Sequence, residues 1–426
     1  MTPGLRVLSA SGQLGFGIPA AAFAAGVARA PDLIGADMGS IDPGPAYLGS
    51  GRMAAAPEMA RRDLELVLLA ARRLGVPLLI GSAGTAGARP HLDATLDMVR
   101  AIARAHGLRF RLASIAADMP RDIVPGARPL GAMRAADLAG TTHLVGQMGT
   151  EAFIRALDAG AEVVVAGRAC DTAIFAALPV LRGYPTALAM HMAKIVECTS
   201  LCCEPGGRDA MLATLDADGF VLESMHPDRA ATPLSVAAHA LYEQEDPYTV
   251  EEPEGTLDLR GARYTAVDAR RTRVDGAAWR PRARPTVKLE GAGPCGERSV
   301  LLCSSADPAV IARLPDLLAT VEATTRELVG AGDFTLHPRI YGEREAFLLL
   351  ECIAPTAARG LAVLGVLRQH LLHLGFPGRL STGGNLAFPF TPAEVSAGTA
   401  YRFTVYHVAE VDALAPLFPL AVEDVG

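Results

Sequence analysis

Two carboxylates and a hydroxyl lie close together in the segment Gly35–Pro45, directly after an apolar run. Asp37, Ser40 and Asp42 carry these groups, and carboxylates of this kind serve as general bases or as hydrogen-bond acceptors. The same segment contains three glycines, which permit close backbone approach, and two prolines, which fix φ. A stiff loop after a buried strand is a common ligand site in open α/β sheets. The alternative interpretation is an Asp-Pro-Gly turn whose carboxylates only accept nearby backbone N–H groups.

Glycine-rich loops of this kind recur between apolar runs and helical stretches, at residues 11–17, 35–45, 81–87 and 167–172. Strands that alternate with helices predict βαβ units and a parallel sheet. We therefore expect residues 1–208 to form an N-terminal Rossmann-like α/β domain with a parallel sheet and helices on both faces. The loop at 11–17 lacks the GxGxxG spacing, so a nicotinamide cofactor is not expected.

In a parallel sheet, every strand-to-helix loop emerges at the same edge, so side chains far apart in sequence converge there. Helix N-termini point at that edge and favour an anion. We take Asp37, Asp42 and Asp171 as candidate catalytic residues. The candidate substrate-binding residues at this edge are Gln13, Ser40, Ser82, Thr85 and Arg168. Arg168 either clamps a substrate carboxylate or pairs with Asp171.

The pattern becomes strand-like after residues 205–207, and Asp218-Gly219 predicts a hairpin turn. Short strands and two helices, at about 308–328 and 357–374, then predict a smaller α+β domain over residues 209–426. Lys288, which shares a strand face with Glu290, is a further candidate for substrate binding. Asn385 lies in a late polar loop suited to an oxyanion site, which would place the site at the interface between the domains.

Three other features leave alternatives open. The three aspartates would also suit a hard cation such as Mg²⁺, and the sequence does not decide whether a metal is bound. Cys198, Cys202 and Cys203 match no common zinc spacing, so they are either small core residues or a thiol nucleophile or soft-metal site. His191 lies on the same predicted helical side as Lys194, either as a base or as a satisfied helix residue.

Composition excludes several classes of protein. The chain has 426 residues, of which half are hydrophobic and a fifth are charged, and its formal net charge is −7. It lacks a basic run, a long apolar stretch and a secretory signal, so nucleic-acid binding and membrane insertion are not expected. We expect a cytoplasmic protein that forms a homo-oligomer.

Four motifs in order, GADMGSIDPGPAYLG (35–49), GSAGTAG (81–87), GRACD (167–171) and GRLSTGGNLAFPF (378–390), carry a family resemblance. The chain resembles the acyclic terpene utilisation family, the AtuA-like proteins, formerly a domain of unknown function. The resemblance implies a part in the breakdown of citronellol- and geraniol-type compounds through CoA thioesters. Many members continue into a small ferredoxin-like domain, which implies a separately encoded ferredoxin-like subunit as a partner here.

These observations together predict a lyase or hydratase that acts on a small carboxylate or an acyl-CoA thioester in a catabolic pathway. Asp37 or Asp171 would abstract a proton next to the carbonyl, and Arg168 would hold the substrate carboxylate. Ser82, Thr85 and Asn385 would hold the developing negative charge. The alternatives are a non-catalytic binding or scaffolding subunit and a hydrolase that uses a cysteine.

Overall fold

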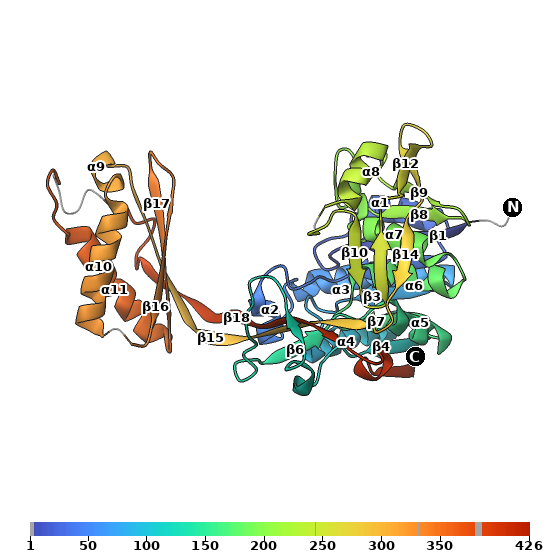
Figure 1. The fold of residues 1–426 in the computed structure, drawn as a ribbon, viewed down its shortest axis with the longest axis horizontal. Coiled ribbons are helices and arrows are strands. Elements are labelled where there is room, and N and C mark those ends of the chain that lie inside the picture. Colours follow the sequence, from blue (N-terminus) through green and yellow to red (C-terminus); the bar gives the residue numbers. More distant parts are fainter. Residues whose placement is uncertain (1–3, 243, 331, 380–385) are drawn as a thin grey trace. The chain divides into compact units, whose positions relative to one another are not determined.

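The computed structural model describes residues 4–242, 244–330, 332–379 and 386–426 (Figure 1). The chain forms two compact units, the first comprising residues up to Gly293 together with Phe403–Gly426, and the second comprising Pro294–Arg402. The boundaries between the units fall within two long strands, β15 (Thr286–Ser305) and β18 (Glu394–Glu410). Each unit has a hydrophobic core of its own.

The first unit is built on a ten-stranded mixed sheet, in the order β12-β13-β9-β8-β1-β2-β3-β7-β4-β19. Its parallel strands are β1 (Leu5–Ser11), β2 (Leu33–Asp37), β3 (Leu78–Gly81), β7 (Val163–Ala166) and β4 (Phe110–Ile115). Antiparallel strands flank them: β8 (Met211–Leu215), β9 (Phe220–Ser224), β13 (Arg271–Asp275) and β12 (Arg263–Ala266) beyond β1, and β19 (Leu420–Val425) beyond β4. The predicted α/β class with parallel strands is confirmed.

Alternate residues of the parallel strands belong to two different hydrophobic clusters, as the two-residue period of a strand requires. Leu8 and Ile34 pack with residues of α1 (Ala20–Ala28), α3 (Pro57–Leu74) and α4 (Arg89–His106). Their neighbours Val7 and Leu33 pack with residues of α5 (Thr150–Asp158), α6 (Asp171–Leu181) and α7 (Thr186–Val196). The parallel strands are therefore buried on both sides, which explains why they read as continuous apolar runs.

The chain divides into its two units at other positions than the boundary expected after residue 208. The predicted hairpin at Asp218-Gly219 is present, because β8 pairs with β9. However, β8 also pairs antiparallel with β1 and so continues the first sheet. The change of pattern near residue 208 marks the switch from parallel to antiparallel pairing, and the boundaries between the units lie instead at residues 293/294 and 402/403.

The remaining elements of the first unit are shorter strands and helices outside the ten-stranded sheet. A three-stranded sheet contains β10 (Thr249–Glu252), β11 (Gly255–Asp258) and β14 (Ala278–Pro281). The strand β6 (His143–Gly146) pairs with Leu289–Ala292 of β15, and β5 (Arg128–Pro129) pairs with β18. Two short helices, α2 (Pro45–Ser50) and α8 (Pro233–Ala240), complete this unit.

The second unit places helices against antiparallel strands. It contains α9 (Pro308–Ile311), α10 (Leu314–Val329), α11 (Ala357–His373), β16 (Thr335–Tyr341) and β17 (Ala346–Ala354), with parts of β15 and β18. The predicted helical stretches at 308–328 and 357–374 are confirmed. No helix in the described ranges is both long and apolar enough to cross a membrane.

A comparison of Gly87, in the loop after β3, with Gly75, at the end of α3, tests how tightly the strand-end loop is packed. Gly75 and Gly87 have nearly the same left-handed φ, +68° and +67°. A Cβ added at Gly75 would meet nothing within 4 Å, whereas a Cβ added at Gly87 would lie 2.0 Å from the backbone nitrogen of Arg168. Both alanine variants should lose roughly 1–2 kcal/mol of unfolding free energy through left-handed strain. Gly87→Ala should lose about 1–3 kcal/mol more, because the backbone near Arg168 must move. Urea unfolding measures both, and equal losses would contradict the packing argument.

Candidate functional site

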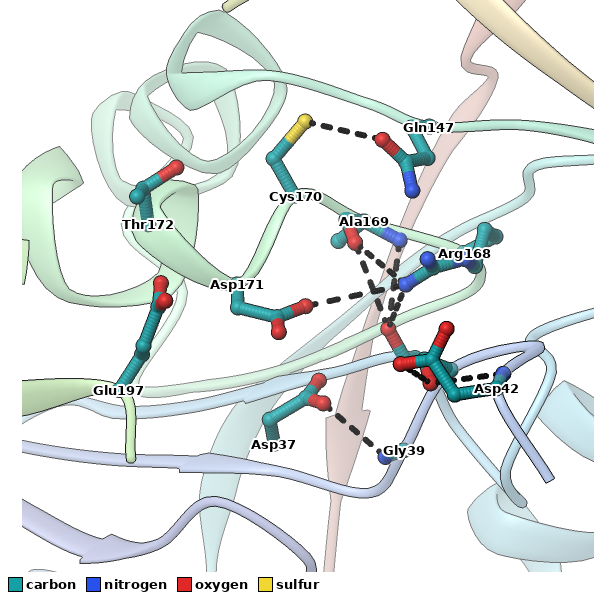
Figure 2. Close-up of polar contacts among 12 residues, drawn as sticks. Asp37, Gly39, Asp42, Gln147, Arg168, Ala169, Cys170, Asp171, Thr172 and Glu197 are labelled. Atoms are coloured by element: carbon teal, nitrogen blue, oxygen red, sulfur yellow. Dashed lines mark hydrogen bonds and ion pairs between the residues drawn. The ribbon is translucent and has the colours of Figure 1, made fainter. Parts of the chain in front are cut away.

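The ends of three parallel strands bring together the residues that the sequence singles out. Asp37 is the last residue of β2 and lies level with Gly81, which ends β3. The Ser82 nitrogen donates to the Gly167 carbonyl at 3.0 Å, which joins the loop after β3 to the loop after β7. Figure 2 shows the Asp171 side chain directed toward the Arg168 guanidinium, with the Asp37 carboxyl below Asp171. The predicted convergence of Asp37, Ser82, Arg168 and Asp171 is therefore observed.

Asp37 is a buried carboxyl with one oxygen that lacks a hydrogen-bond partner. The residue is 2 % exposed, and its Oδ2 accepts a hydrogen bond from the Gly39 nitrogen at 3.0 Å. In the described part of the chain, its Oδ1 has no hydrogen-bond partner. Burial is the main reason that the pKa of Asp37 lies well above its ordinary value, and the charge of Asp171 is the second. Arg168, the Gly39 N–H and Ser82 act to lower this pKa. Asp37 therefore holds a proton at pH values where an exposed aspartate is ionised.

Asp171 has a different environment, although it faces the same site. Its side chain is 41 % exposed, and its Oδ1 lies 3.7 Å from Nη1 of Arg168. Burial raises the pKa of Asp171 above its ordinary value, and the charges of Arg168 and Lys194 oppose this shift without cancelling it. Because Asp171 reaches solvent and faces a cation directly, we assign the ionised state to Asp171 and the retained proton to Asp37. Two neighbouring carboxyls whose environments differ in this way can serve as base and acid.

Arg168 forms a buried ion pair with Glu290 of β15. The side chains are 5 % and 0 % exposed, and Arg168 Nε lies 2.8 Å from Glu290 Oε2. Arg168 Nη1 donates to Ser82 Oγ at 3.1 Å and to the Ala169 carbonyl at 2.9 Å. Acceptors of the protein itself thus engage the guanidinium. This geometry favours a structural ion pair over a clamp on a substrate carboxylate.

The backbone at Ser82 and Thr85 is strained. Their φ angles are +46° and +100°, in the region that residues other than glycine rarely adopt. Thr85 Oγ1 accepts from the Ala54 nitrogen at 2.9 Å, so this hydroxyl also fixes the loop before α3. Strain of this kind persists only where surrounding contacts enforce it, and it is concentrated at functional sites.

The remaining candidates at this edge lie at its rim. Asp42 is exposed, and Ser40 Oγ donates to its Oδ2 at 2.8 Å. Gln13 is also exposed, and the next residue, Leu14, donates its backbone N–H to the Asp37 carbonyl at 2.7 Å. Asn385 falls outside the described residues, so its predicted role stays a prediction.

Lys288 contacts the Glu290 member of the Arg168–Glu290 pair. Its Nζ is 3.6 Å from Glu290 Oε1 and 4.8 Å from the centre of the Tyr406 ring. Gln147 Nε2 donates to the same Glu290 oxygen at 3.0 Å, and Cys170 Sγ lies 3.6 Å from Gln147 Oε1. Lys288, Gln147 and Cys170 all line a cavity of about 910 Å³.

Three of these residues were not selected from the sequence. Glu290 was noted only as a neighbour of Lys288, and the two-residue spacing on one strand was the available signal. Gln147 and Glu252 gave none, because Gln147 follows β6, which pairs with the distant β15, and Glu252 meets Thr172 across 80 positions of the chain. Glu252 is 5 % exposed, accepts from Thr172 Oγ1 at 2.8 Å, and has a pKa raised to about 8 by burial.

The other candidate chemistries have less support. His191 is fully buried against Phe220 and Tyr264, and burial lowers its pKa to about 3. Burial, with the charge of Glu252 next, raises the pKa of Cys170 well above its ordinary value, so its thiol is neutral.

A metal site receives no support from the side-chain arrangement. Among the residues that the structure describes, no group of three or more His, Cys, Asp or Glu side chains could hold a metal ion. The residues therefore do not fit the Mg²⁺ that Asp37, Asp42 and Asp171 would suit by type.

Comparison with known proteins gives one match. The family model described as "Acyclic terpene utilisation family protein AtuA" matches residues 6–342. No curated protein and no solved structure gave a significant match.

The Arg168–Glu290 pair predicts a large difference between buried and exposed carboxylates. Glu290→Gln leaves a buried guanidinium without its counter-charge, so the unfolding free energy should fall by roughly 3–5 kcal/mol. Glu423→Gln removes the partner of Arg100 in a pair that is 34 % and 46 % exposed, and should change it by about 0–1 kcal/mol. Arg168→Met with Glu290→Leu should be more stable than Glu290→Gln alone. Chemical denaturation measures all three, and similar losses from both single changes would contradict the buried pair.

The raised pKa of Asp37 predicts an unusual pH dependence. Above the unfolded pKa of about 3.9, the unfolded chain releases this proton and the folded chain keeps it, so wild-type stability falls as pH rises toward the folded pKa. Asp37→Asn should therefore gain at least about 1 kcal/mol relative to wild type between pH 4 and pH 7, since one pKa unit equals about 1.36 kcal/mol. Asp216→Asn is the control, because the hydrogen bond from Arg273 lowers the pKa of Asp216 to about 2, so its effect on stability should stay constant between pH 4 and pH 7 and change only below about pH 4. Thermal unfolding across this pH range measures both, and a difference for Asp37→Asn that does not change with pH would refute the assignment.

Proposed function

Because the chain belongs to the acyclic terpene utilisation family AtuA, we propose that it is an acid–base enzyme of acyclic terpene catabolism. Its proposed reaction is addition or elimination next to the carbonyl of a small carboxylate or an acyl-CoA thioester, as in a hydratase or lyase. The observation that carries this proposal is the Asp37–Asp171 pair. Its two carboxyls face one site from unequal environments, because Asp37 is enclosed and has a strongly raised pKa, whereas Asp171 is 41 % exposed and lies beside Arg168.

An elimination next to a carbonyl needs a base for the carbon-bound proton and an acid for the departing oxygen. Asp171, which is partly solvated and faces Arg168, would accept the proton from carbon. Asp37 would donate its retained proton to the leaving hydroxyl through Oδ1, the buried atom that has no hydrogen-bond partner in the described residues. Hydration would run through the same steps in reverse.

The enolate formed after proton abstraction carries negative charge that the site must stabilise. Arg168 supplies a fixed positive charge, and α6 begins at Asp171 with the N-terminus of its helix dipole. We propose Arg168 as a positioning residue that holds Ser82 and Asp171 in place. Asp42 and the other predicted residues at the rim would contact the substrate.

Two of the earlier alternatives fit the site less well. A cysteine hydrolase needs a thiolate, whereas burial keeps Cys170 protonated. A non-catalytic binding subunit has no need for two buried or half-buried carboxyls held beside one arginine. The proposal includes a Rossmann-like arrangement of the parallel strands, in which ligands bind at the carboxyl ends of the strands.

The test is turnover of branched, unsaturated acyl-CoA thioesters and of the free acids. Asp171→Asn and Asp37→Asn should each lower kcat by about 10²- to 10⁴-fold, the usual contribution of a general base or acid. Asp216→Asn makes the same chemical change in an exposed ion pair of another strand and should retain full activity. In Asp37→Asn, the residual rate should also lose its decline at high pH, because the proton donor is gone.

Folded Asp37→Asn and Asp171→Asn proteins with wild-type rates would remove both aspartates from the reaction. A wild-type protein that turns over none of these compounds would favour the non-catalytic binding or scaffolding role.

A further inference from the structure

A large cavity in the first unit lies apart from the two aspartates. Its volume is about 910 Å³, and all its lining residues belong to this unit. One wall comes from residues 126–131, another from the β10 region, and a third from β15 with the end of β18. Two of the lining residues, Gln147 and Cys170, lie near Arg168 (Figure 2), and Cys170 precedes Asp171 in the chain.

The charge of the lining contrasts with the charge of the whole chain. Four cations face the cavity: Arg128, Arg282, Arg284 and Lys288. The carboxylates of the lining are Glu245, Glu251, Glu252 and Glu410, but burial raises the pKa of Glu252 to about 8. At neutral pH the four cations of the lining therefore face three ionised carboxylates, of which Glu251 pairs with Arg282 and Glu410 with Arg284. Because these two carboxylates are 61 % and 68 % exposed, an anionic ligand can compete with them for the arginines.

The cations differ in how firmly the protein holds them. Lys288 is fixed by Tyr406 and by Glu290, which is itself fully buried. Arg284 is 57 % exposed, and its partners Asp412, at 3.0 Å, and Glu410, at 3.6 Å, are 95 % and 68 % exposed. An exposed pair of this kind is worth about 0–1 kcal/mol, so a phosphate or carboxylate group can replace Asp412 with little loss. The cavity thus combines a fixed cation with arginines that can turn to a ligand.

The size of the cavity indicates which anion it would take. Small-molecule sites usually measure roughly 300–1,000 Å³, and this one is near the upper limit. A small carboxylate would leave most of it filled with water, whereas a nucleotide-sized ligand would occupy it. Several arginines also suit phosphate oxygens, which they bind in bidentate fashion.

We propose that this cavity binds the phosphate-bearing carrier of an acyl thioester substrate. The inference rests on the proposed function and decides between its two substrate classes in favour of the thioester. Arg128 and Arg284 contact the phosphates, and Lys288 with Gln147 holds the inner end of the carrier. Because Cys170 lines the cavity and is followed by Asp171, the carrier leads toward the first turn of α6.

Isothermal titration calorimetry of free CoA binding to the full chain tests this site without any turnover. Wild-type protein should bind CoA saturably, with an affinity that falls as salt is raised. Arg128→Ala with Arg284→Ala should weaken CoA binding at least tenfold. Arg263→Ala with Arg273→Ala is the matched control, because it removes two paired arginines of β12 and β13 that do not line the cavity, and it should leave the affinity unchanged.

Two outcomes would overturn the proposal: no saturable binding of CoA, or an affinity that the Arg128/Arg284 variant does not alter. Binding of a branched dicarboxylate that depends on these arginines, without binding of CoA, would overturn the phosphate assignment in favour of a substrate carboxylate. ADP should bind more weakly than CoA, and equal affinities would overturn the assignment to a thioester carrier.

Asp171→Asn separates this proposal from the proposed function. The variant should bind CoA with wild-type affinity while losing turnover. Normal CoA binding by a wild-type protein that turns over no thioester would remove the acid–base reaction and support the binding site.

Discussion

The buried ion pair between Arg168 and Glu290 is the interaction on which the site depends. Its two side chains are almost fully removed from water, so neither charge can lose its partner without a large desolvation penalty. The pair joins the end of β7 to β15, a strand that enters this region more than a hundred residues later in the sequence. Ser82, Asp171, Gln147 and Lys288 all contact one member of the pair, so its geometry sets theirs.

The same pair determines how the two aspartates share charge. The guanidinium and the Glu290 carboxylate neutralise each other, which leaves only part of the positive field of Arg168 for a second carboxylate. Asp171 lies closer to solvent and takes that field, whereas Asp37 is enclosed and carries the proton. Two chemically identical side chains thereby obtain different roles from burial and from their distance to one cation.

The sequence was informative where topology alone dictates proximity. Loops after parallel strands must emerge at one edge, so Asp37, Ser82, Arg168 and Asp171 could be grouped before any coordinates were known. Glu290, Gln147 and Glu252 could not, because β6 and β15 meet through an antiparallel pairing distant in sequence and Glu252 meets Thr172 across 80 positions of the chain. The same limit explains the boundary expected after residue 208, because an antiparallel strand that extends a parallel sheet has the same alternation as one in a new domain.

The strand β19 has a consequence for how the first unit is made in the cell. It is the only neighbour of β4 on one side, with Leu420 opposite Ile115 and Val425 opposite Phe110 in the described residues. During translation, the ribosome therefore completes the whole second unit before β4 receives its last partner. Until then, the nascent chain presents an open strand edge next to an apolar core, the kind of edge at which chains aggregate. Such long-range closure also slows folding, so the newly made protein spends this interval exposed to chaperones and proteases.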